Sequence, residues 1–444
     1  MSSRPLAVLL LVLAACVVGC ADSAPDAARP DPTTQETPAP RPEPRASGTF
    51  VYAGNQGTRT IDAFSVGQST GALAPLPSAS VSLGGVPVAL AIDRQARFVY
   101  VAMRQGPNAL AAYAIDRETG ALTLVPASQL PPPPRSTVAR WGRGSLDVSN
   151  IALDPSGELA YVVYDYRCVP PDCTGCSSVG IRAYLYSYAV DSRSGRLTRL
   201  DNRPVYVGVG SDDLEPPPTR SVQVVVHGHH LYTLDRGIVA LIGDRDCTLA
   251  GRPSLRGFDV DHGSGELHDL GTFARGEEDY PGRWLGLTPS GDYLYIVAGE
   301  AQRFARDATT GALERVGTFR GISAGVFAPS GRLYGAMGTE IRVFTVQHDT
   351  GQLTDTGGGG ATPGFDQIVV DPRGRYLFGL SPASRERVIY AFAIDPAAGQ
   401  LTLAPGDPTS LGAPPPSDGR PPLHPGGQDG AKSHDELSSY QGRD

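Results

Sequence analysis

The sequence predicts an all-β protein folded as a seven-bladed β-propeller with four-stranded antiparallel blades. Two repeated motifs carry this prediction, and the composition agrees with them. The 444 residues include 54 Gly and 40 Pro, about a fifth of the chain, which argues against a mainly helical protein. The body of the chain is therefore expected to consist of short strands joined by many turns.

The first repeated motif is a turn in which a glycine is followed two residues later by leucine, usually with an aspartate four residues before the glycine. Successive copies lie 49, 75, 70, 46, 40 and 48 residues apart. A period of about 40–50 residues is typical of a four-stranded propeller blade. The seven glycines are Gly71, Gly120, Gly195, Gly265, Gly311, Gly351 and Gly399.

The second repeated motif is a short run of β-branched and aromatic residues that predicts a strand. Most copies follow a turn such as Asp-Pro-Ser-Gly. Each repeat thus reads as strand a, a tight turn, strand b, a loop, strand c, the Gly-x-Leu turn and strand d. A long β-sandwich, the alternative, would not keep this order through seven copies. The runs begin at Phe50, Phe98, Ala160, Leu231, Tyr293, Leu333 and Tyr376.

The residues of one blade carry a family resemblance. They read Phe98-Val99-Tyr100-Val101-Ala102, then Ala112-Tyr113-Ala114-Ile115-Asp116, then Thr119-Gly120-Ala121-Leu122-Thr123. This pattern resembles the propeller lactonase family, which includes 6-phosphogluconolactonase-type and carboxymuconate-lactonizing proteins. The resemblance covers about residues 48–405 and lies in strand and turn residues that every blade needs. It implies the propeller fold and, as an activity, lactone hydrolysis or formation.

Residues 1–19 are expected to be a signal peptide. Arg4 supplies a positive charge, and the apolar run from Leu6 to Val18 is too short to cross a bilayer. The end of this run, Val17-Val18-Gly19-Cys20, resembles the lipobox of bacterial lipoproteins, which implies cleavage before Cys20 and acylation of that cysteine. An ordinary secretory signal is the alternative. Several acyl chains anchor a protein stably, so we expect membrane attachment in the bacterial cell envelope, on the periplasmic side or at the cell surface.

The rest of the chain divides into a Pro-rich tether at 20–47, the propeller at 48–405 and a Pro/Gly-rich tail at 406–444. The tether and the tail are expected to be disordered, because they hold too few large apolar residues to bury a core. The propeller segment begins on strand b, so blade 1 needs a strand a from elsewhere, usually the C-terminus. Residues 405–425 are too rich in Pro to supply an obvious one.

Charge and residue usage exclude several functions. A net charge of −8 argues against a nucleic-acid partner. The only lysine is Lys432, in the polar tail, so Schiff-base and P-loop chemistry lack the lysine that they need. No apolar run reaches the ~18 residues of a membrane span. No cofactor and no bound metal are predicted.

The long insertions all fall on one rim of the predicted propeller. A four-stranded meander puts its a–b and c–d turns on one rim and its b–c and d–a loops on the other. The insertions occupy b–c and d–a positions over blades 2 to 5, where we expect a small molecule or a protein to bind. They are residues 127–147, 164–180, 203–219, 235–255 and 274–282.

Four cysteines lie in these insertions. Cys168, Cys173 and Cys176 belong to the b–c loop of blade 3, and Cys247 to the b–c loop of blade 4. Neighbouring loops could be joined by disulfides, with three possible pairings. The alternative is an iron–sulfur site, since C-x₄-C-x₂-C is a known ligand spacing. We favour disulfides, because the fourth cysteine is 71 residues further on and the chain is expected to reach an oxidising compartment.

The starts of the inner strands, at the mouth of the central channel, are the predicted binding site. Polar and aromatic residues recur there at equivalent positions, which a buried strand does not require. Arg283 is suited to hold a carboxylate or phosphate. A solvated channel end without a ligand is the alternative. The candidate residues are Asn150, Gln223, Arg283, Trp284, Asp366 and Gln367.

Two functions are compatible with this sequence. The favoured one is a membrane-tethered binding or scaffold module that uses the long-loop rim. The other, implied by the family resemblance, is a lactone hydrolase or lactonizing enzyme in which Arg283 holds the substrate carboxylate and Asp366 assists proton transfer. Against the enzyme, no histidine reaches the predicted mouth.

Two further motifs are expected to have no catalytic role. Gly321-Ile322-Ser323-Ala324-Gly325 matches G-x-S-x-G, but a nucleophile elbow needs a strand-to-helix turn and a strand is predicted to follow here. His227, His229 and His230 fall in an a–b turn, where solvated histidines are favoured over metal ligands.

Overall fold

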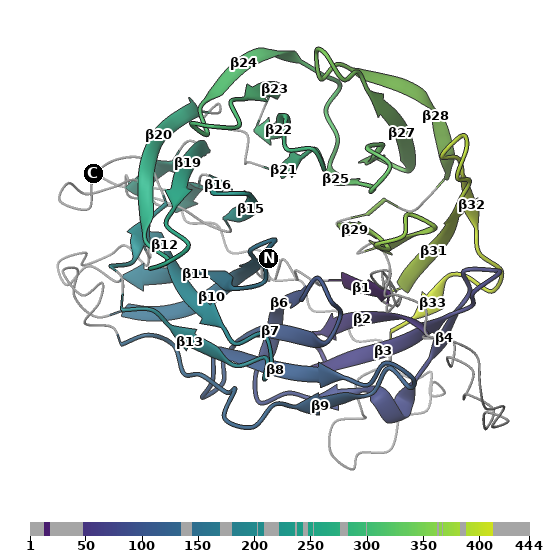
Figure 1. The fold of residues 1–444 in the computed structure, drawn as a ribbon, viewed down its shortest axis with the longest axis horizontal. Coiled ribbons are helices and arrows are strands. Elements are labelled where there is room, and N and C mark those ends of the chain that lie inside the picture. Colours follow the sequence, from purple (N-terminus) through teal and green to yellow (C-terminus); the bar gives the residue numbers. More distant parts are fainter. Residues whose placement is uncertain are drawn as a thin grey trace, which may run out of the picture.

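The computed structural model confirms a seven-bladed β-propeller of four-stranded antiparallel sheets. Figure 1 shows the blades arranged around a central axis, with strand a of each blade innermost and strand d at the periphery. The structure describes residues 13–17, 48–134, 144–168, 180–201, 203–207, 222–235, 238–242, 247–251, 253–275, 283–298, 300–361, 364–365, 367–381 and 388–411.

The first three blades use the N-terminal part of the chain. Blade 1 consists of β1 (Leu13–Val17), β2 (Thr49–Asn55), β3 (Thr60–Val66) and β4 (Leu73–Pro75), followed by a 3₁₀ turn η1 (Pro77–Ala79) and β5 (Val81–Ser82). Blade 2 consists of β6 (Val86–Ile92), β7 (Phe98–Arg104), β8 (Leu110–Ile115) and β9 (Leu122–Leu124). Blade 3 consists of β10 (Gly144–Leu153), β11 (Leu159–Cys168), β12 (Gly180–Val190) and β13 (Leu197–Arg199), with β14 (Val205–Tyr206) paired to β12.

The remaining blades follow the same order. Blade 4 contains β15 (Gln223–His227), β16 (His230–Leu234), β19 (Ser254–Val260) and β20 (Leu267–Arg275). Blade 5 contains β21 (Trp284–Leu287), β22 (Tyr293–Ala298), β23 (Glu300–Arg306) and β24 (Leu313–Thr318). Blade 6 contains β25 (Ala324–Phe327), β26 (Leu333–Met337), β27 (Glu340–Val346) and β28 (Leu353–Ala361). Blade 7 contains β29 (Gln367–Val370), β30 (Tyr376–Ser381), β31 (Val388–Ile394) and β32 (Leu401–Leu403), with β33 (Thr409–Ser410) paired to β31.

The cores lie between the blades. Within the described residues, seven apolar clusters each combine side chains of two neighbouring blades, and the cluster that joins blades 7 and 1 closes the ring. A blade therefore buries its two faces only by packing against its neighbours, as expected of a repeat architecture. This is why the strand b residues of β2 are buried along the whole strand.

The two repeated sequence motifs meet at these blade boundaries. In the c–d turn of blade 2, Asp116 Oδ1 accepts the N–H groups of Glu118 and Thr119 at 2.9 Å each, and Gly120 takes a left-handed φ of 73°. The hydroxyl of Tyr52 in blade 1 donates to Gly120 O at 2.8 Å. The same bond joins Tyr232 to Gly311, Tyr295 to Gly351 and Tyr334 to Gly399, and Tyr376 donates to Gln68 O to join blade 7 to blade 1.

Strand a of blade 1 comes from the N-terminal part of the chain. β1 pairs antiparallel with β2, from Leu13 opposite Ala53 to Val17 opposite Thr49. The usual C-terminal source is therefore not used. β1 lies inside the apolar run assigned to the export signal, so one segment fits both descriptions. At the other end, β33 extends the paired structure to Ser410, past the expected boundary at residue 405.

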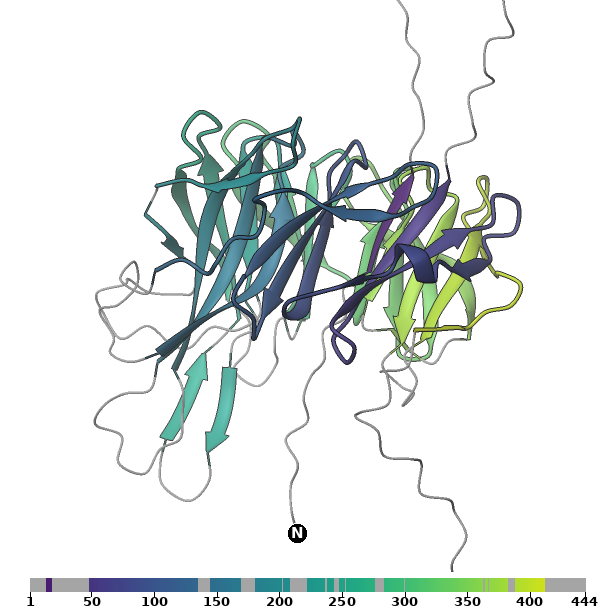
Figure 2. The same ribbon diagram turned by 90° about the horizontal axis from the view of Figure 1, so that it is seen from below.

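Two expected loops contain more strand than the sequence predicts. In blade 3, β11 continues to Cys168 and β12 begins at Gly180. In blade 4, the expected b–c loop contains a hairpin of β17 (Ile238–Ile242) and β18 (Cys247–Gly251), which projects from the body in Figure 2. Cys173 and Cys176, and the side chains of Cys168 and Cys247, lie outside what the structure describes, so the disulfides stay a prediction. Among the described residues, no helix has the length and apolar character needed to cross a membrane.

Asp407 is expected to make stability depend on pH. Burial raises the pKa of Asp407 to about 6, although Thr409 Oγ1 and the Ala391 N–H both donate to its carboxylate. Because the folded pKa exceeds the unfolded value of about 3.9, the stability contributed by this proton is complete below about pH 4 and is lost as pH rises through 6. Asp407→Asn should therefore raise the melting temperature at pH 8, by roughly 1–2 °C for a half-exposed carboxyl, and not at pH 4.

Thermal unfolding followed by circular dichroism at both pH values checks this expectation. Asp201→Asn, at an exposed position, is the control for loss of one negative charge. If Asp407→Asn shifts the melting temperature equally at pH 4 and pH 8, the Asp407 carboxyl has the same pKa in the folded and unfolded states.

Candidate functional site

Three of the predicted mouth residues use their side chains to join inner strands of neighbouring blades. Asn150 Nδ2 donates to Val222 O of the next blade at 2.9 Å. Gln223 Nε2 donates to Arg283 O at 2.8 Å, and its Oε1 accepts the N–H of Leu285 at 2.6 Å. These amide groups are therefore occupied by backbone partners, which explains why polar residues recur at this position without requiring a ligand.

Trp284 plays the same part between blades 5 and 6. Its indole Nε1 donates to Gly325 O at 2.8 Å, and the side chain is 6% exposed. Gln367 begins β29 at the equivalent position of blade 7 and is half-buried. Asp366 lies outside the described residues, so its predicted role beside Arg283 stays a prediction.

A cavity of about 460 Å³ lies on the channel-mouth rim between blades 5 and 6. Arg283 contributes to it from the start of β21, and the other walls come from the β24–β25 connection and the β26–β27 turn. The cavity is thus on the rim that carries the long loops. Those loops lie over blades 2 to 5, whereas the cavity lies at the boundary between blades 5 and 6. Its lining residues are Arg283, Val297, Arg320, Gly321, Ile322, Ser323, Met337, Gly338, Glu340 and Arg342.

The backbone of Arg283 is fixed while its side chain remains exposed. Its N–H donates to Val297 O at 2.7 Å, and its carbonyl accepts the Gln223 amide. Arg320 is also exposed, in the segment between β24 and β25. Neither guanidinium forms an ion pair within the described part of the chain.

The third arginine of the cavity is already neutralised. Arg342 Nη2 lies 2.8 Å from Glu340 Oε2, and Arg342 Nη1 lies 3.8 Å from Asp355 Oδ2. Glu340 is the one carboxylate among the described residues of the lining, so three arginines face one negative charge there. Among the described residues, the cavity therefore presents two positive charges that no carboxylate neutralises, an arrangement that attracts carboxylate or phosphate groups.

Ser323 is not arranged as a nucleophile. Its hydroxyl donates to Ala336 O at 3.0 Å, and its N–H donates to the same carbonyl at 2.7 Å. Strand β25 follows directly, as the sequence predicts, so the strand-to-helix turn of a nucleophile elbow is missing here. No histidine is among the described residues that line the cavity.

The three clustered histidines lie at the a–b turn of blade 4, on the opposite rim, as predicted. One part of that prediction is wrong, because His230 is 4% exposed and not solvated. Its Nδ1 lies 2.9 Å from Arg306 Nη1, and burial and this arginine lower the pKa of His230. No three His, Cys, Asp or Glu side chains group as metal ligands in the residues that the structure describes.

Sequence reasoning missed Arg320, Glu340 and Arg342. Arg320 directly precedes the Gly321–Gly325 motif, and Glu340 follows a turn too short to stand out as an insertion. A search for charged residues at every b–c and d–a connection, whatever its length, would have found them.

Comparison with known proteins supports the propeller assignment. The model of the family "Lactonase, 7-bladed beta-propeller" matches residues 43–138. No curated protein matches the chain significantly. The resemblance to the propeller lactonase family is thus confirmed, by a sequence match in the first two blades, and the seven-bladed fold of the chain agrees with it.

Three solved structures share the fold at low sequence identity. A protein from Bacteroides uniformis, named "putative 6-phosphogluconolactonase", is 21% identical with a TM-score of 0.55, covering 79% of this chain and 92% of its own. A protein of the same name from Bacteroides fragilis is 19% identical with a TM-score of 0.54, covering 82% and 95%. A Lactobacillus plantarum protein is 17% identical with a TM-score of 0.51, covering 79% and 91%.

Proposed function

We propose that this lactonase-like propeller binds a small organic anion in the cavity between blades 5 and 6. The observation that carries the proposal is the pair of exposed guanidinium groups of Arg283 and Arg320, which have no ion-pair partner among the described residues. Arginine presents parallel N–H groups that fit the two oxygens of a carboxylate or phosphate. A sugar acid or a carboxylated lactone is of suitable size for a cavity of about 460 Å³.

Titration of the intrinsic tryptophan fluorescence tests this binding. The indole of Trp284 and the side chain of Ile322, a cavity residue, both approach Gly325, so a bound anion should change the emission of Trp284. Trp141→Phe removes the other tryptophan of the chain. Gluconate, glucarate and 6-phosphogluconate serve as probes, and we expect saturable quenching that weakens with added salt. No response to any anion at millimolar concentration would refute the proposal.

A second candidate function is lactone hydrolysis in the same cavity. It is favoured by the family-model match and by the name of the two Bacteroides proteins. In this reaction water adds to the lactone carbonyl and the ring C–O bond breaks, giving a hydroxy acid. Glu340 would take a proton from the water and return it to the ring oxygen, while Arg283 and Arg320 would stabilise the charge on the carbonyl oxygen.

Proton release from aldono-, mucono- and acyl-lactones in a pH-stat checks the hydrolysis. Glu340→Gln should lower the rate by about 100-fold, the lower range for loss of a general base. Glu314→Gln, on an exposed position of β24, is the matched control and should leave the rate unchanged. A flat trace over the whole panel would exclude hydrolysis and leave the binding proposal standing.

The proposed location of this activity is the cell envelope, with Cys20 as the lipid-bearing residue. Cleavage before Cys20 would remove β1, so the processed protein would present the inner edge of β2. Mass spectrometry of membrane-extracted protein should find acylated Cys20 at the N-terminus, and Cys20→Ser should release the protein from the membrane fraction. Recovery of residues 13–17 in the mature protein would contradict this assignment.

A further inference from the structure

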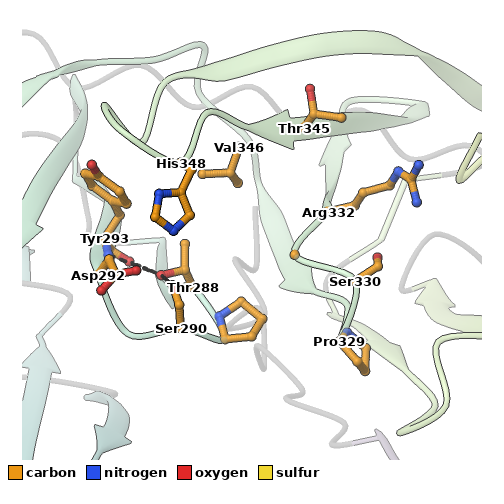
Figure 3. A pocket seen from close by; sticks show the side chains of 12 residues that line it. Thr288, Ser290, Asp292, Tyr293, Pro329, Ser330, Arg332, Thr345, Val346 and His348 are labelled. Atoms are coloured by element: carbon orange, nitrogen blue, oxygen red, sulfur yellow. Dashed lines mark hydrogen bonds between the residues drawn. The ribbon is translucent and has the colours of Figure 1, made fainter.

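A second cavity, of about 470 Å³, lies between blades 5 and 6 on the opposite rim, where the a–b and c–d turns gather (Figure 3). It is separate from the proposed anion site and independent of it. Its walls are the a–b turn of blade 5 (288–293), the a–b turn of blade 6 (329–332) and the start of the c–d turn of blade 6 (345–348).

Because the blades repeat, the a–b turn of blade 5 can be compared with the a–b turn of blade 2. In blade 2 the N–H of Asp93 donates to Phe98 O at 3.1 Å, and in blade 5 the N–H of Thr288 donates to Tyr293 O at 3.0 Å. Thr288 thus corresponds to Asp93 and Tyr293 to Phe98. The residue before the aromatic is Arg97 in blade 2.

In blade 2 this place is filled by an ion pair. Arg97 Nε lies 3.3 Å from Asp93 Oδ2, and its guanidinium lies 5.5 Å from the centroid of the Phe98 ring. Blade 7 repeats the arrangement, with Arg375 Nε 4.0 Å from Asp371 Oδ2 and its guanidinium 5.3 Å from the centroid of the Tyr376 ring. A guanidinium beside both a carboxylate and an aromatic ring thus occurs at this position in blades 2 and 7.

Blade 5 keeps the aromatic ring and a carboxylate but lacks the arginine. Asp292 stands where blade 2 has Arg97, and Thr288 Oγ1 accepts the Tyr293 N–H at 3.1 Å, as Asp93 does for Phe98. The main-chain carbonyl of Asp292 accepts the N–H of Arg306 at 2.8 Å, and within the described ranges of the chain its carboxylate has no hydrogen bond or ion pair. Its charge reaches His227, on the neighbouring turn of blade 4. The shorter side chains leave the cavity open, and both Asp292 and Tyr293 line it.

We propose that this cavity binds the guanidinium group of an arginine from a ligand. The bound arginine would take the place that Arg97 fills in blade 2 and Arg375 fills in blade 7. Asp292 would pair with the guanidinium, the ring of Tyr293 would stack on it, and the hydroxyl of Ser290 would accept a further N–H. Figure 3 shows the imidazole of His348 on the same side of the cavity as Asp292 and Tyr293. Arg332 lies across the cavity from them, and its guanidinium donates to Ala397 O. The volume exceeds that of one guanidinium, so a whole arginine residue with its neighbours fits.

Calorimetric titration of the full-length protein with Nα-acetyl-arginine methylamide tests the proposal. The citrulline counterpart has the same shape without the charge, and we expect it to bind at least tenfold more weakly. Asp292→Asn should weaken arginine binding at least tenfold, whereas Glu314→Gln should leave it unchanged. An end-blocked Gly-Arg-Gly peptide, compared with the single residue, distinguishes a polypeptide source of the arginine from a free one.

A variant that supplies its own arginine to the cavity provides an independent readout. Thr288→Asp combined with Asp292→Arg rebuilds the blade 2 pair in blade 5, so it should abolish arginine binding and hold the melting temperature at or above that of the parent. Equal binding of the arginine and citrulline compounds, or undiminished arginine binding by Asp292→Asn or by the double variant, would overturn the proposal.

Discussion

Gly120→Ala is expected to lower the free energy of unfolding by about 3 kcal/mol. Gly120 has a φ of 73°, a conformation that costs an L-residue about 1 kcal/mol or more. A Cβ at this position would lie 2.5 Å from Phe50 Cδ1, and Phe50 is 3% exposed in the core between blades 1 and 2. The ring cannot move into solvent, so the added methyl group would force the blades apart, with an overpacking cost of about 2 kcal/mol.

Gly157→Ala separates the two parts of this cost. Gly157 has a φ of 78°, but nothing lies within 4 Å of the added Cβ, so only the backbone term of about 1 kcal/mol remains. Urea unfolding of both variants measures the difference, provided that the slopes agree and the transition is two-state. If Gly120→Ala and Gly157→Ala are equally destabilised, the blade contact at Phe50 accommodates a methyl group and the overpacking argument fails.

This contact also explains why the fold could be predicted from sequence. The Asp-x-x-x-Gly turn and the strand b aromatic residue recur because each does two things. Each stabilises its own turn or strand, and each contacts the neighbouring blade. The turn glycine takes the left-handed conformation, and its missing side chain leaves room for the neighbouring ring, as at Gly195, where a Cβ would lie 2.4 Å from Phe98. A motif that serves the same purpose seven times leaves a period in the sequence.

The candidate site was less predictable, because its residues come together only when the ring closes. Asn150, Gln223 and Trp284 look like a binding site when each strand is considered alone. Their partners are backbone groups of the next blade, which no local pattern reveals. Arg320 and Glu340, by contrast, lie in short connections without any sequence signature, and only the packing of blade 5 on blade 6 places them beside Arg283.

Strand a of blade 1 was unpredictable for a different reason. A short run of Leu, Ala and Val has the apolar character of an export signal and also of a buried strand, and periodicity alone does not distinguish them. The pairing of β1 with β2 is a non-local contact across a long Pro-rich segment. Only the empty inner position of blade 1 indicates that a strand is needed there.

The double variant Arg283→Ala, Arg320→Ala is expected to weaken binding of a sugar-acid anion by about 100-fold. Hydrogen bonds to charged groups contribute about 1.5–3 kcal/mol when a partner is removed, and about 1.4 kcal/mol corresponds to a factor of ten, so each exposed guanidinium should account for about tenfold. The measurement is the fluorescence titration of Trp284 in the Trp141→Phe background, with glucarate as the probe.

The fold should survive this change, because Arg283 supports the blade through its backbone. Its N–H and carbonyl bonds, to Val297 and Gln223, do not involve the side chain, and Arg320 is exposed. The melting temperature should therefore stay within about 1 °C of the parent. Arg94→Ala, which removes an exposed arginine from the opposite rim, controls for the loss of positive charge and should keep the parental affinity. If the double variant binds glucarate within twofold of the parent, the anion is held elsewhere on the propeller, and Arg283 and Arg320 have another purpose.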